Sequence, residues 1–536
     1  MSCCCGEEWD GTRIKRQCDT LIYRLYEFTI TIMDTNSPLE KLHVIDRECC
    51  LLQRTAALLH WDMETYLPPL GIEERSEQLA LLESLYHERF TSSETGHLLE
   101  ELGSVTDNPQ GDEKLPELER DFLKVTRRDY DKKKKLPVDF VAAAARAEGL
   151  SNAAWAEARR NNDFNAFLPH LETMIDFAKK RSLYWGFEGR VYNGLLDIYE
   201  PNMGVSEIAS VFTPLRKRLS ALLKKIAQKP EPDCSFLNDE IDAESQARFN
   251  LELTKYLGFN SNRGRLDISA HPFTTTLGSH DVRITTRYLP GNFLSSIFST
   301  IHECGHAFYE LNIAKELRRT CLADGTSMGV HESQSRLWEN VIGRSLPFWE
   351  GLFPVLKKCI PGRFDAVNAD DFYRAVNLAK PSLIRVEADE VSYSLHIILR
   401  FELEQGLFSG SIKASDLPLL WRSKMKEYLG IEPETDADGV LQDVHWSHGS
   451  FGYFPSYALG NLYGLQFFEK LKSDIPDFEG LIAKGNFSPV HEWLSDNIHK
   501  WGRRLEPAEL LKKVTGEELS VEPFLRYIEE KYSAIY

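Results

Sequence analysis

Apolar residues recur at helical spacing along most of the chain. The clearest segments are Leu39–His60, Arg75–Leu82, Phe140–Arg160 and Phe164–Lys229. Spacings of three and four residues place apolar side chains on one face of a helix, and Pro68-Pro69 marks a loop between the first two segments. The pattern therefore predicts a mainly α-helical protein.

Two short segments follow a different pattern. His271–Gly278 and Asp281–Tyr288 are rich in β-branched residues and alternate around a Gly-Ser turn. This pattern predicts a hairpin in one small β-sheet, after which helical spacing resumes to the end of the chain. The edge of such a strand can bind an extended peptide as an added strand.

The chain shows no repeats and no clear linker inside its main part. Residues 1–37 are predicted to form a flexible amino-terminal extension that contains several cysteines, and residues 38–536 to form a single large helical body. Cys3, Cys4 and Cys5 offer acylation sites, but an unmodified extension without a role is the expected alternative.

Composition narrows the class of partners and the compartment. The 536 residues include 42% hydrophobic and 27% charged residues, as in ordinary globular proteins, and the net charge is −18. That charge argues against nucleic acid as a partner, because phosphate binding needs a basic surface. The ten cysteines show no disulfide spacing and follow no signal peptide, which favours a cytoplasmic location. No apolar run reaches membrane length, so no transmembrane segment is expected.

The segment Phe298–Glu310 carries the clearest chemical signal. It contains His302-Glu303-Cys304-Gly305-His306, the HExxH pattern, in a predicted helix that begins after Pro290-Gly291. Residues i and i+4 lie on one helix face, so both imidazoles can bind one metal ion. Glu303 beside them is placed to act as general base, whereas Cys304 is expected to pack on the far side of the helix.

A catalytic zinc site needs a third protein ligand and one open position. Glu332, which follows His306 by 26 residues, is one candidate, and the adjacent His331 is another. An ordinary surface carboxylate is an equally good interpretation of Glu332 taken alone. Glu310 lies on the wrong side of its helix, about two turns from His302. Two histidines, a carboxylate and a base are typical of peptide hydrolysis by Glu-assisted attack of metal-bound water.

Several further motifs occur in order along the chain. They are HPF at His271–Phe273, DxRxT at Asp281–Thr285, HExxH at His302–His306, HESQ at His331–Gln334, IRxxAD at Ile384–Asp389 and GxxQDxHW at Gly439–Trp446. With WDMETYLPPLG near the amino terminus, this set resembles the carboxypeptidase Taq family of metallopeptidases from about residue 38 to the end. The resemblance implies that His302, His306 and Glu332 bind the metal and that Glu303 is the general base.

A carboxypeptidase must also recognise a free terminal carboxylate, which the planar guanidinium of arginine suits best. Arg385 of the IRxxAD motif is the first candidate, and the alternative for it is a structural ion pair with Asp389. Arg283 of the DxRxT motif is a second candidate, with a local ion pair on its strand as the alternative. His271 of the HPF motif is expected to shape the cleft near the scissile bond.

The segment HWSHGSFGYFPSYALG supplies further polar groups. It is similar to the His-and-Tyr loop of the neurolysin and angiotensin-converting-enzyme type of HExxH peptidases. The resemblance implies that Tyr453 or Tyr457 stabilises the oxyanion and that His445 and His448 contact the substrate backbone. For each tyrosine, packing alone is the alternative role.

Together these features predict a mainly α-helical, neurolysin-like body with a deep active-site groove and a metallocarboxypeptidase catalytic domain over residues 38–536. We expect release of single carboxyl-terminal residues from peptides with broad specificity. Zinc is the expected metal, with cobalt or manganese as alternatives, and the resemblance implies a homodimer. Alternatives are an oligoendopeptidase or dipeptidyl carboxypeptidase with the same metal chemistry, and a non-catalytic peptide-binding protein. An endopeptidase would tolerate an amidated substrate, and a pure binder would not need Glu303.

Overall fold

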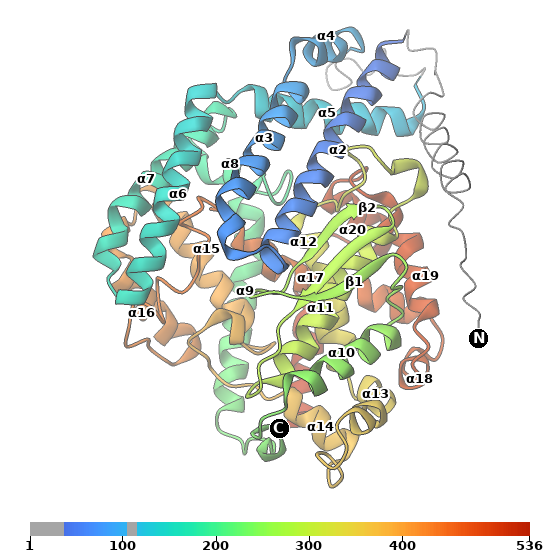
Figure 1. The fold of residues 1–536 in the computed structure, drawn as a ribbon. Helices are drawn as coiled ribbons and strands as arrows, with labels where there is room; N and C mark the ends of the chain where they lie inside the picture. The colour runs from blue at the N-terminus through green and yellow to red at the C-terminus, as the bar shows by residue number, and fades with distance from the viewer. Residues whose placement is uncertain (1–36, 104–114) are drawn as a thin grey trace, which may run out of the picture.

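The computed structural model describes residues 37–103 and 115–536 (Figure 1). This part of the chain is mainly helical and contains one three-stranded sheet, so the predicted fold class is confirmed at this level. The predicted extension, apart from Ser37, and its three amino-terminal cysteines lie outside the described residues.

The helices of the amino-terminal half precede the sheet. They are α2 (Pro38–Thr65), α3 (Ile72–Phe90), α4 (Ser93–Glu101), α5 (Glu117–Lys134), α6 (Val138–Asn161), α7 (Phe164–Tyr184), α8 (Val191–Leu196), α9 (Val205–Ile226) and α10 (Ala243–Tyr256). Helix α2 begins where the main body was predicted to begin: Ser37 and Glu40 form a capping box around Pro38 at the first helical position.

The remaining helices follow the sheet. They are α11 (Phe293–Leu311), α12 (Met328–Arg336), the π-helix η4 (Leu337–Ile342), α13 (Leu346–Cys359), α14 (Ala369–Val376), α15 (Tyr393–Ser409), α16 (Leu417–Leu429), α17 (Phe454–Asp474), α18 (Phe478–Ala483), α19 (Ser488–Asn497), α20 (Pro507–Thr515) and α21 (Glu522–Ile535). The predicted HExxH helix is α11, which begins just after Pro290-Gly291 as expected.

The small sheet has the strand order β1-β3-β2. Strands β2 (Thr274–Gly278) and β3 (Asp281–Thr286) form the predicted antiparallel hairpin, whereas β1 (Gly264–Ile268) pairs with β3 in parallel and was not predicted. Figure 1 shows the sheet in the middle of the molecule, where α11 packs on β3 and β2, and α2 packs on β2. The edge strand β2 therefore lies beside the HExxH helix.

Glycines allow the helices that carry the HExxH and HESQ motifs to approach closely. A Cβ atom on Gly305 of α11 would lie 2.6 Å from the Cα atom of Ser335 in α12, and one on Gly460 of α17 would lie 2.6 Å from Cγ of Glu332. Both distances are too short for a Cβ atom, so glycine fits these two positions without a shift of the neighbouring helix. Gly305, within the HExxH motif, thus allows α12 to bring Glu332 within reach of the two histidines.

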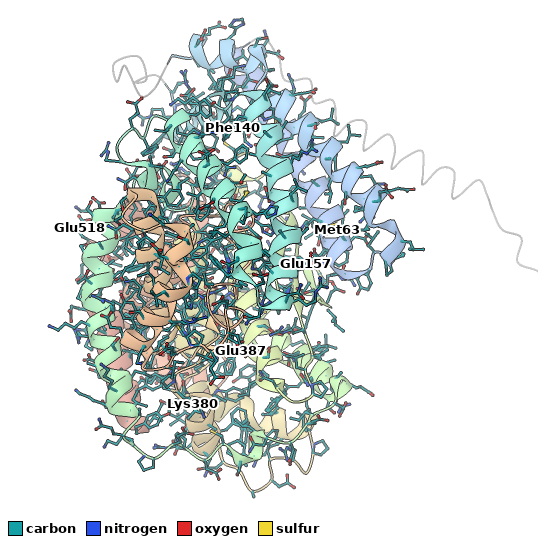
Figure 2. All side chains as sticks on the ribbon, turned by 90° about the vertical axis from the view of Figure 1, so that its left-hand side faces the viewer. Met63, Phe140, Glu157, Lys380, Glu387 and Glu518 are labelled. Atoms are coloured by element: carbon teal, nitrogen blue, oxygen red, sulfur yellow. The ribbon has the colours of Figure 1, made fainter. Side chains whose placement is uncertain are left out.

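Buried apolar residues form two clusters. The larger spans most of the chain from α6 to α21, and the smaller joins α2–α5 to Ile313, Leu317 and Leu322. Figure 2 shows that side chains fill the space between the ribbons. Among the described helices, none combines the length and hydrophobicity that crossing a bilayer requires. The predicted deep groove and the neurolysin-like architecture stay predictions.

Candidate metal centre

Three side chains offer donor atoms to one point beside α11. Nε2 of His302 lies 3.6 Å and Nε2 of His306 lies 3.4 Å from Oε2 of Glu332. Among the described residues this trio forms the single group of His, Cys, Asp or Glu side chains close enough to hold a metal ion. His331, the other candidate from the sequence, does not belong to it.

The trio fits a divalent cation. Donors bound 2.0–2.2 Å from a tetrahedral ion are separated by about 3.4 Å, close to the spacing found here. Glu332 is a carboxylate because, although burial opposes it, Arg336 and His302 hold its pKa well below the usual range. Burial, reinforced by His331 and His302, lowers the pKa of His306 to about 4, so that imidazole is neutral and its lone pair is available.

Carboxylates behind the ligands fix their orientation. Nδ1 of His302 lies 2.8 Å from Oε2 of Glu339, so His302 donates its Nδ1–H there and keeps its Nε2 lone pair for a metal. Arg336 donates to Oε1 of Glu332 at 2.7 Å and to Glu339 at 3.2 Å. Glu339 and Arg336 were missed in the sequence, although both lie within two helical turns of Glu332.

The second histidine is oriented by a longer chain of contacts. Nδ1 of His306 lies 2.6 Å from Nδ1 of His331, whose Nε2 lies 2.9 Å from Oε1 of Glu310. The arrangement assigns one proton to each contact: His306 donates to His331, and His331 donates to Glu310. Thr276 on β2 donates to the other oxygen of Glu310. His331 and Glu310 therefore orient His306 and do not belong to the donor trio.

We predict that Glu339→Gln weakens metal binding by about 10–100-fold, because His302 loses the charged acceptor that holds its ring. Titration of metal-free protein with zinc would measure the affinity. Full activity at saturating metal is expected, since Glu339 contacts Nδ1 of His302 and not the Nε2 that lies near Glu332. An unchanged zinc affinity would contradict the orienting role of Glu339.

The close contact at Gly460 gives a second prediction. Gly460→Ala places a methyl group against the side chain of Glu332, so we expect at least about tenfold weaker metal binding. Gly464→Ala is the matched control, because its Cβ would lie 3.1 Å from the carbonyl oxygen of Ser333 and leaves Glu332 alone. Equal zinc affinities of the two variants in the same titration would exclude Glu332 at this position as a ligand.

Glu303 lies beside the donor trio and is 6% exposed. Burial raises the pKa of its carboxyl, which suits a general base better than an ordinary exposed carboxylate. The hydroxyl of Thr274 on β2 donates to Oε2 of Glu303 at 2.6 Å and to its backbone oxygen at 3.0 Å. The edge strand thus fixes the rotamer of Glu303. Cys304 is fully buried in the apolar core, as expected.

Arg385 is held by an aspartate far along the chain. Its Nε and Nη2 donate to Oδ1 of Asp443 at 2.9 and 2.8 Å, and Arg400 donates through Nε to Oδ2 at 2.7 Å. The alternative ion pair with Asp389 is not formed, because Asp389 instead accepts from the backbone and hydroxyl of Ser392. Two guanidiniums share one carboxylate, which leaves a net positive charge in a buried environment.

The other predicted arginine and histidine lie apart from that network. Arg283 donates to both oxygens of Asp281 at 3.0 Å and stacks 4.2 Å over the ring of Trp61. This is the local ion pair that the sequence offered as an alternative. His271 is exposed at the start of the hairpin, and its backbone oxygen accepts from Ser269.

The predicted His-and-Tyr loop brings its aromatic residues together. Nε2 of His445 lies 3.2 Å from the hydroxyl of Tyr457, and its ring stacks on Tyr453 at 5.5 Å. The guanidinium of Arg385 lies 5.0 Å from the ring centre of Tyr457. Burial, with Arg385 among the nearby cations, lowers the pKa of His445 to about 3. His448 is partly exposed in the same loop.

A buried carboxylate anchors this loop. Glu404 on α15 accepts from Tyr192 at 2.7 Å, from Nε1 of Trp446 at 2.7 Å and from the backbone N–H of Gly452 at 2.8 Å. Burial raises the pKa of Glu404 from its ordinary 4.5 to about 7, although these donors oppose the shift. Sequence analysis missed Glu404, which lies about 40 residues before the loop.

The raised pKa of Glu404 sets a pH dependence of stability. Below pH 4.5 the carboxyl is protonated in both the folded and the unfolded chain, and stability is lost as the pH rises through about 7. The melting temperature of the wild type, compared with that of Glu404→Gln, should therefore decrease as the pH rises from 4.5 to about 7. Calorimetry of both proteins across this range checks it, and parallel curves would contradict the shifted pKa.

Comparison with known proteins identifies the family. The model of the carboxypeptidase Taq (M32) metallopeptidases matches residues 41–532. The chain belongs to this M32 family. Carboxypeptidase 1 of Bacillus subtilis is 42% identical over 485 residues, which cover 90% of this chain and 95% of that protein. Thermostable carboxypeptidase 1 of Thermus thermophilus is 41% identical over 516 residues, 94% of this chain and 100% of that protein.

Solved structures agree with this M32 assignment. The M32 carboxypeptidase from Deinococcus radiodurans R1 superposes with a TM-score of 0.90 at 36% identity, over 93% of this chain and 99% of that one. A Pyrococcus furiosus carboxypeptidase structure gives a TM-score of 0.89 at 40% identity, over 93% and 99%. The M32 chain is thus a metal-dependent carboxypeptidase, a hydrolase of peptide bonds.

Proposed function

We propose that the M32 chain releases single residues from the carboxyl end of extended peptides, with broad tolerance for the terminal side chain. The observation that supports this proposal most directly is the convergence of His302, His306 and Glu332 beside the buried Glu303. Zinc is the proposed metal, because two imidazoles and one carboxylate in a tetrahedral spacing suit it, and cobalt or manganese are alternatives.

His302, His306 and Glu332 would hold a divalent cation, which would supply an activated water and a positive charge for the developing oxyanion. Glu303 accepts the proton of the attacking water and then passes it to the leaving amine. Thr274 keeps the Glu303 carboxylate in one rotamer by donating to Oε2, so the base is already oriented when substrate binds. The hydroxyl of Tyr453 or Tyr457 donates a hydrogen bond to the oxyanion.

We assign recognition of the peptide's terminal carboxylate to the surplus positive charge of the two guanidiniums around Asp443. Arg385 and Arg400 share that single carboxylate, and Nη1 of Arg385 contacts the hydroxyl of Tyr393 at 3.2 Å. A terminal carboxylate near Arg385 would neutralise the excess charge. Arg283 is the second candidate, although it is paired with Asp281.

Three histidines are proposed to make the remaining contacts with the substrate. We assign His445 and His448 to the substrate backbone, since both come from the loop that Glu404 anchors, and His271 to the cleft wall near the scissile bond. A deep groove of the neurolysin-like kind would bind the peptide along the edge strand β2. Thr274 of that strand already contacts Glu303.

Cleavage of a peptide ladder tests the proposed activity. Free-acid peptides should lose one residue at a time, with activity abolished by a chelator and restored by zinc. Peptides with an amidated carboxyl end should be cleaved at least about 100-fold more slowly, because the charge recognised by arginine is missing. Equal cleavage of amidated peptides would favour the oligoendopeptidase alternative, and release of dipeptides the dipeptidyl carboxypeptidase.

A homodimer in a cytoplasmic setting is proposed as well. Val44, Leu51 and Leu58 recur every seven residues along α2 and are 40–57% exposed, which gives α2 an apolar stripe of the kind found at interfaces. The six cysteines of the described residues are free thiols, which suits a reducing compartment. Light scattering should give the dimer mass for the wild type and the monomer mass for Leu51→Asp.

A further inference from the structure

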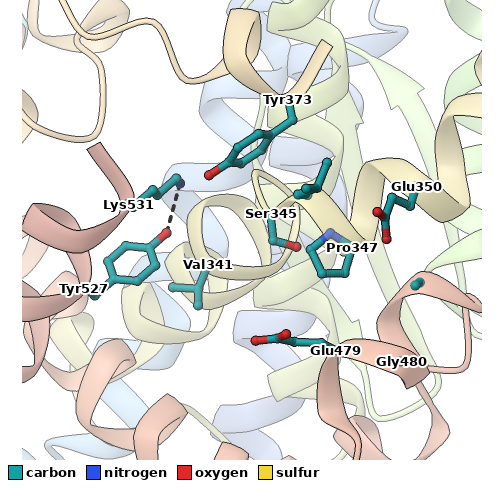
Figure 3. A pocket seen from close by; sticks show the side chains of 11 residues that line it. Val341, Ser345, Pro347, Glu350, Tyr373, Glu479, Gly480, Tyr527 and Lys531 are labelled. Carbon is teal, nitrogen blue, oxygen red and sulfur yellow. Dashed lines mark hydrogen bonds between the residues drawn. The ribbon is translucent and has the colours of Figure 1, made fainter. Parts of the chain in front are cut away.

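Buried polar groups with an unused hydrogen-bond donor mark places where a ligand can bind. The lysine that lines the pocket between η4, α13 and α21 has no such donor (Figure 3), because Lys531 pairs with Glu390 at 2.8 Å. Its other two N–H groups face the hydroxyl of Tyr527 and the carbonyl oxygen of Asn340. A hydroxyl at the start of α15 differs, since the O–H of Tyr393 has no acceptor among the residues that the structure describes.

The Tyr393 hydroxyl accepts one hydrogen bond and has one to give. Nη1 of Arg385 donates to its oxygen at 3.2 Å, so the phenolic hydrogen is not used in this contact. Burial raises the pKa of Tyr393, although Arg336 and Arg385 oppose the shift, and the phenol therefore keeps its proton at neutral pH. Tyr393 is only 6% exposed, so its free O–H is a largely desolvated donor.

The ring of Tyr393 lies between the donor trio and Arg385. The guanidinium of Arg336 stacks 4.3 Å from the ring centre, and Nε of Arg336 donates to Glu332 at 2.7 Å. The hydroxyl at the other end of the ring meets Arg385. The terminal carboxylate of a substrate that is cleaved at the trio lies one residue beyond the scissile bond, so its donors must lie within a few side chains of the metal ligands. Tyr393 meets this requirement, because a single side chain separates it from Glu332.

Arg385 keeps donors for the same anion. Asp443 accepts from Nε and from one N–H of Nη2, and Tyr393 accepts from one N–H of Nη1, so each terminal nitrogen of Arg385 has one N–H left. The positive charge is not cancelled, since Arg400 shares the carboxylate of Asp443. Nη1 of Arg385 and the Tyr393 oxygen are 3.2 Å apart, close enough for one carboxylate to accept from both.

We propose that Tyr393 is a second residue that binds the terminal carboxylate of the substrate: its phenolic hydrogen goes to one carboxylate oxygen, while Arg385 donates to the other. This role deepens the proposed carboxypeptidase function and rests on it. Two adjacent donors also discriminate against a blocked end, because a carboxylate accepts with both oxygens. A terminal amide has one oxygen and an NH₂ group that only donates, so it leaves one of the two donors unpaired.

Tyr393→Phe tests the direct contact, because phenylalanine keeps the ring beneath Arg336 and removes only the O–H. In the full-length, zinc-loaded protein, kcat/KM for a free-acid peptide should fall at least about tenfold, and that for its amide by less than about threefold. Tyr463→Phe is the matched control, because Tyr463 is a buried tyrosine of α17 whose hydroxyl has no partner among the described residues. It should leave both rates unchanged. An unchanged free-acid rate in Tyr393→Phe, or an equal loss for both peptides, would overturn the proposal.

A second background separates direct contact from an effect through Arg385. Adding Tyr393→Phe to Arg385→Ala should lower cleavage of the free-acid peptide by about a further tenfold, since the phenol itself touches the carboxylate. No further loss would leave Tyr393 as a residue that only orients Arg385, and would overturn the proposal. A wild-type enzyme that cleaves both peptides equally would reject the proposed function together with this role, whereas a wild-type preference that persists in Tyr393→Phe would reject the role of Tyr393 alone.

Discussion

Replacing Glu303 by glutamine should lower kcat/KM for free-acid peptides by about 10²–10⁴-fold while the metal stays bound. Glutamine keeps the size of the side chain and an oxygen for the Thr274 hydroxyl, which lies 2.6 Å from Oε2 in the wild type. What disappears is the carboxylate that is proposed to accept the proton of the attacking water. The loss should fall on kcat, because Glu303 acts on the reacting atoms and is not assigned to binding of the peptide.

Metal analysis and a second variant make this test specific. Zinc content and melting temperature of Glu303→Gln should equal those of the wild type. Glu310→Gln is the matched control, since Glu310 is a buried glutamate two turns further along α11 that contacts His331. Its activity should return at high zinc concentration, whereas that of Glu303→Gln should not. Near-normal hydrolysis by Glu303→Gln would remove the base from the mechanism.

Local sequence patterns predicted those parts of the molecule that depend on local spacing. Helical periodicity and the Pro-Gly break located α11, and β-branched alternation located the hairpin of β2 and β3. The i, i+4 spacing of His302 and His306 places both rings on one helix face because helix geometry is nearly invariant. The position of Glu332 near the two histidines was harder to predict from the sequence. It depends on the close approach of α12 to α11 and α17, which Gly305 and Gly460 allow and which no periodicity identifies.

Residues that act through long-range contacts could not be predicted in this way. Arg385 and Asp443 are separated by 58 positions, and a short local pair with Asp389 was the simpler hypothesis. The anchoring of the aromatic loop by Glu404 likewise depends on how α15 packs beside residues 446–452. Strand β1 was missed because Gly264–Ile268 is a five-residue strand that alternates charged and apolar residues and pairs with β3 rather than with a sequence neighbour.

The second large effect concerns Arg385. Arg385→Ala should lower kcat/KM for free-acid peptides by about 10²–10³-fold, because the proposed charge-assisted contact between its guanidinium and the terminal carboxylate would contribute several kcal/mol. The cleavage of amidated peptides should change little, so the variant should lose the preference for a free carboxyl end. Asp443 keeps Arg400 as a partner at 2.7 Å, and the aspartate is therefore not left as a buried unpaired charge.

Arg283→Ala is the comparison that decides between the two candidate arginines. Arg283 forms a one-to-one ion pair with Asp281, which leaves no surplus positive charge there, so its removal should cost far less activity. The ratio of kcat/KM for a free-acid peptide to that for its amide should collapse in Arg385→Ala and persist in Arg283→Ala. The opposite outcome would move carboxylate recognition to the sheet. Arg385 shares Asp443 with Arg400, so the preference for a free carboxyl end should depend on the surplus positive charge of this network. Arg385→Lys keeps that charge but lacks the planar guanidinium, and it should therefore retain part of the preference.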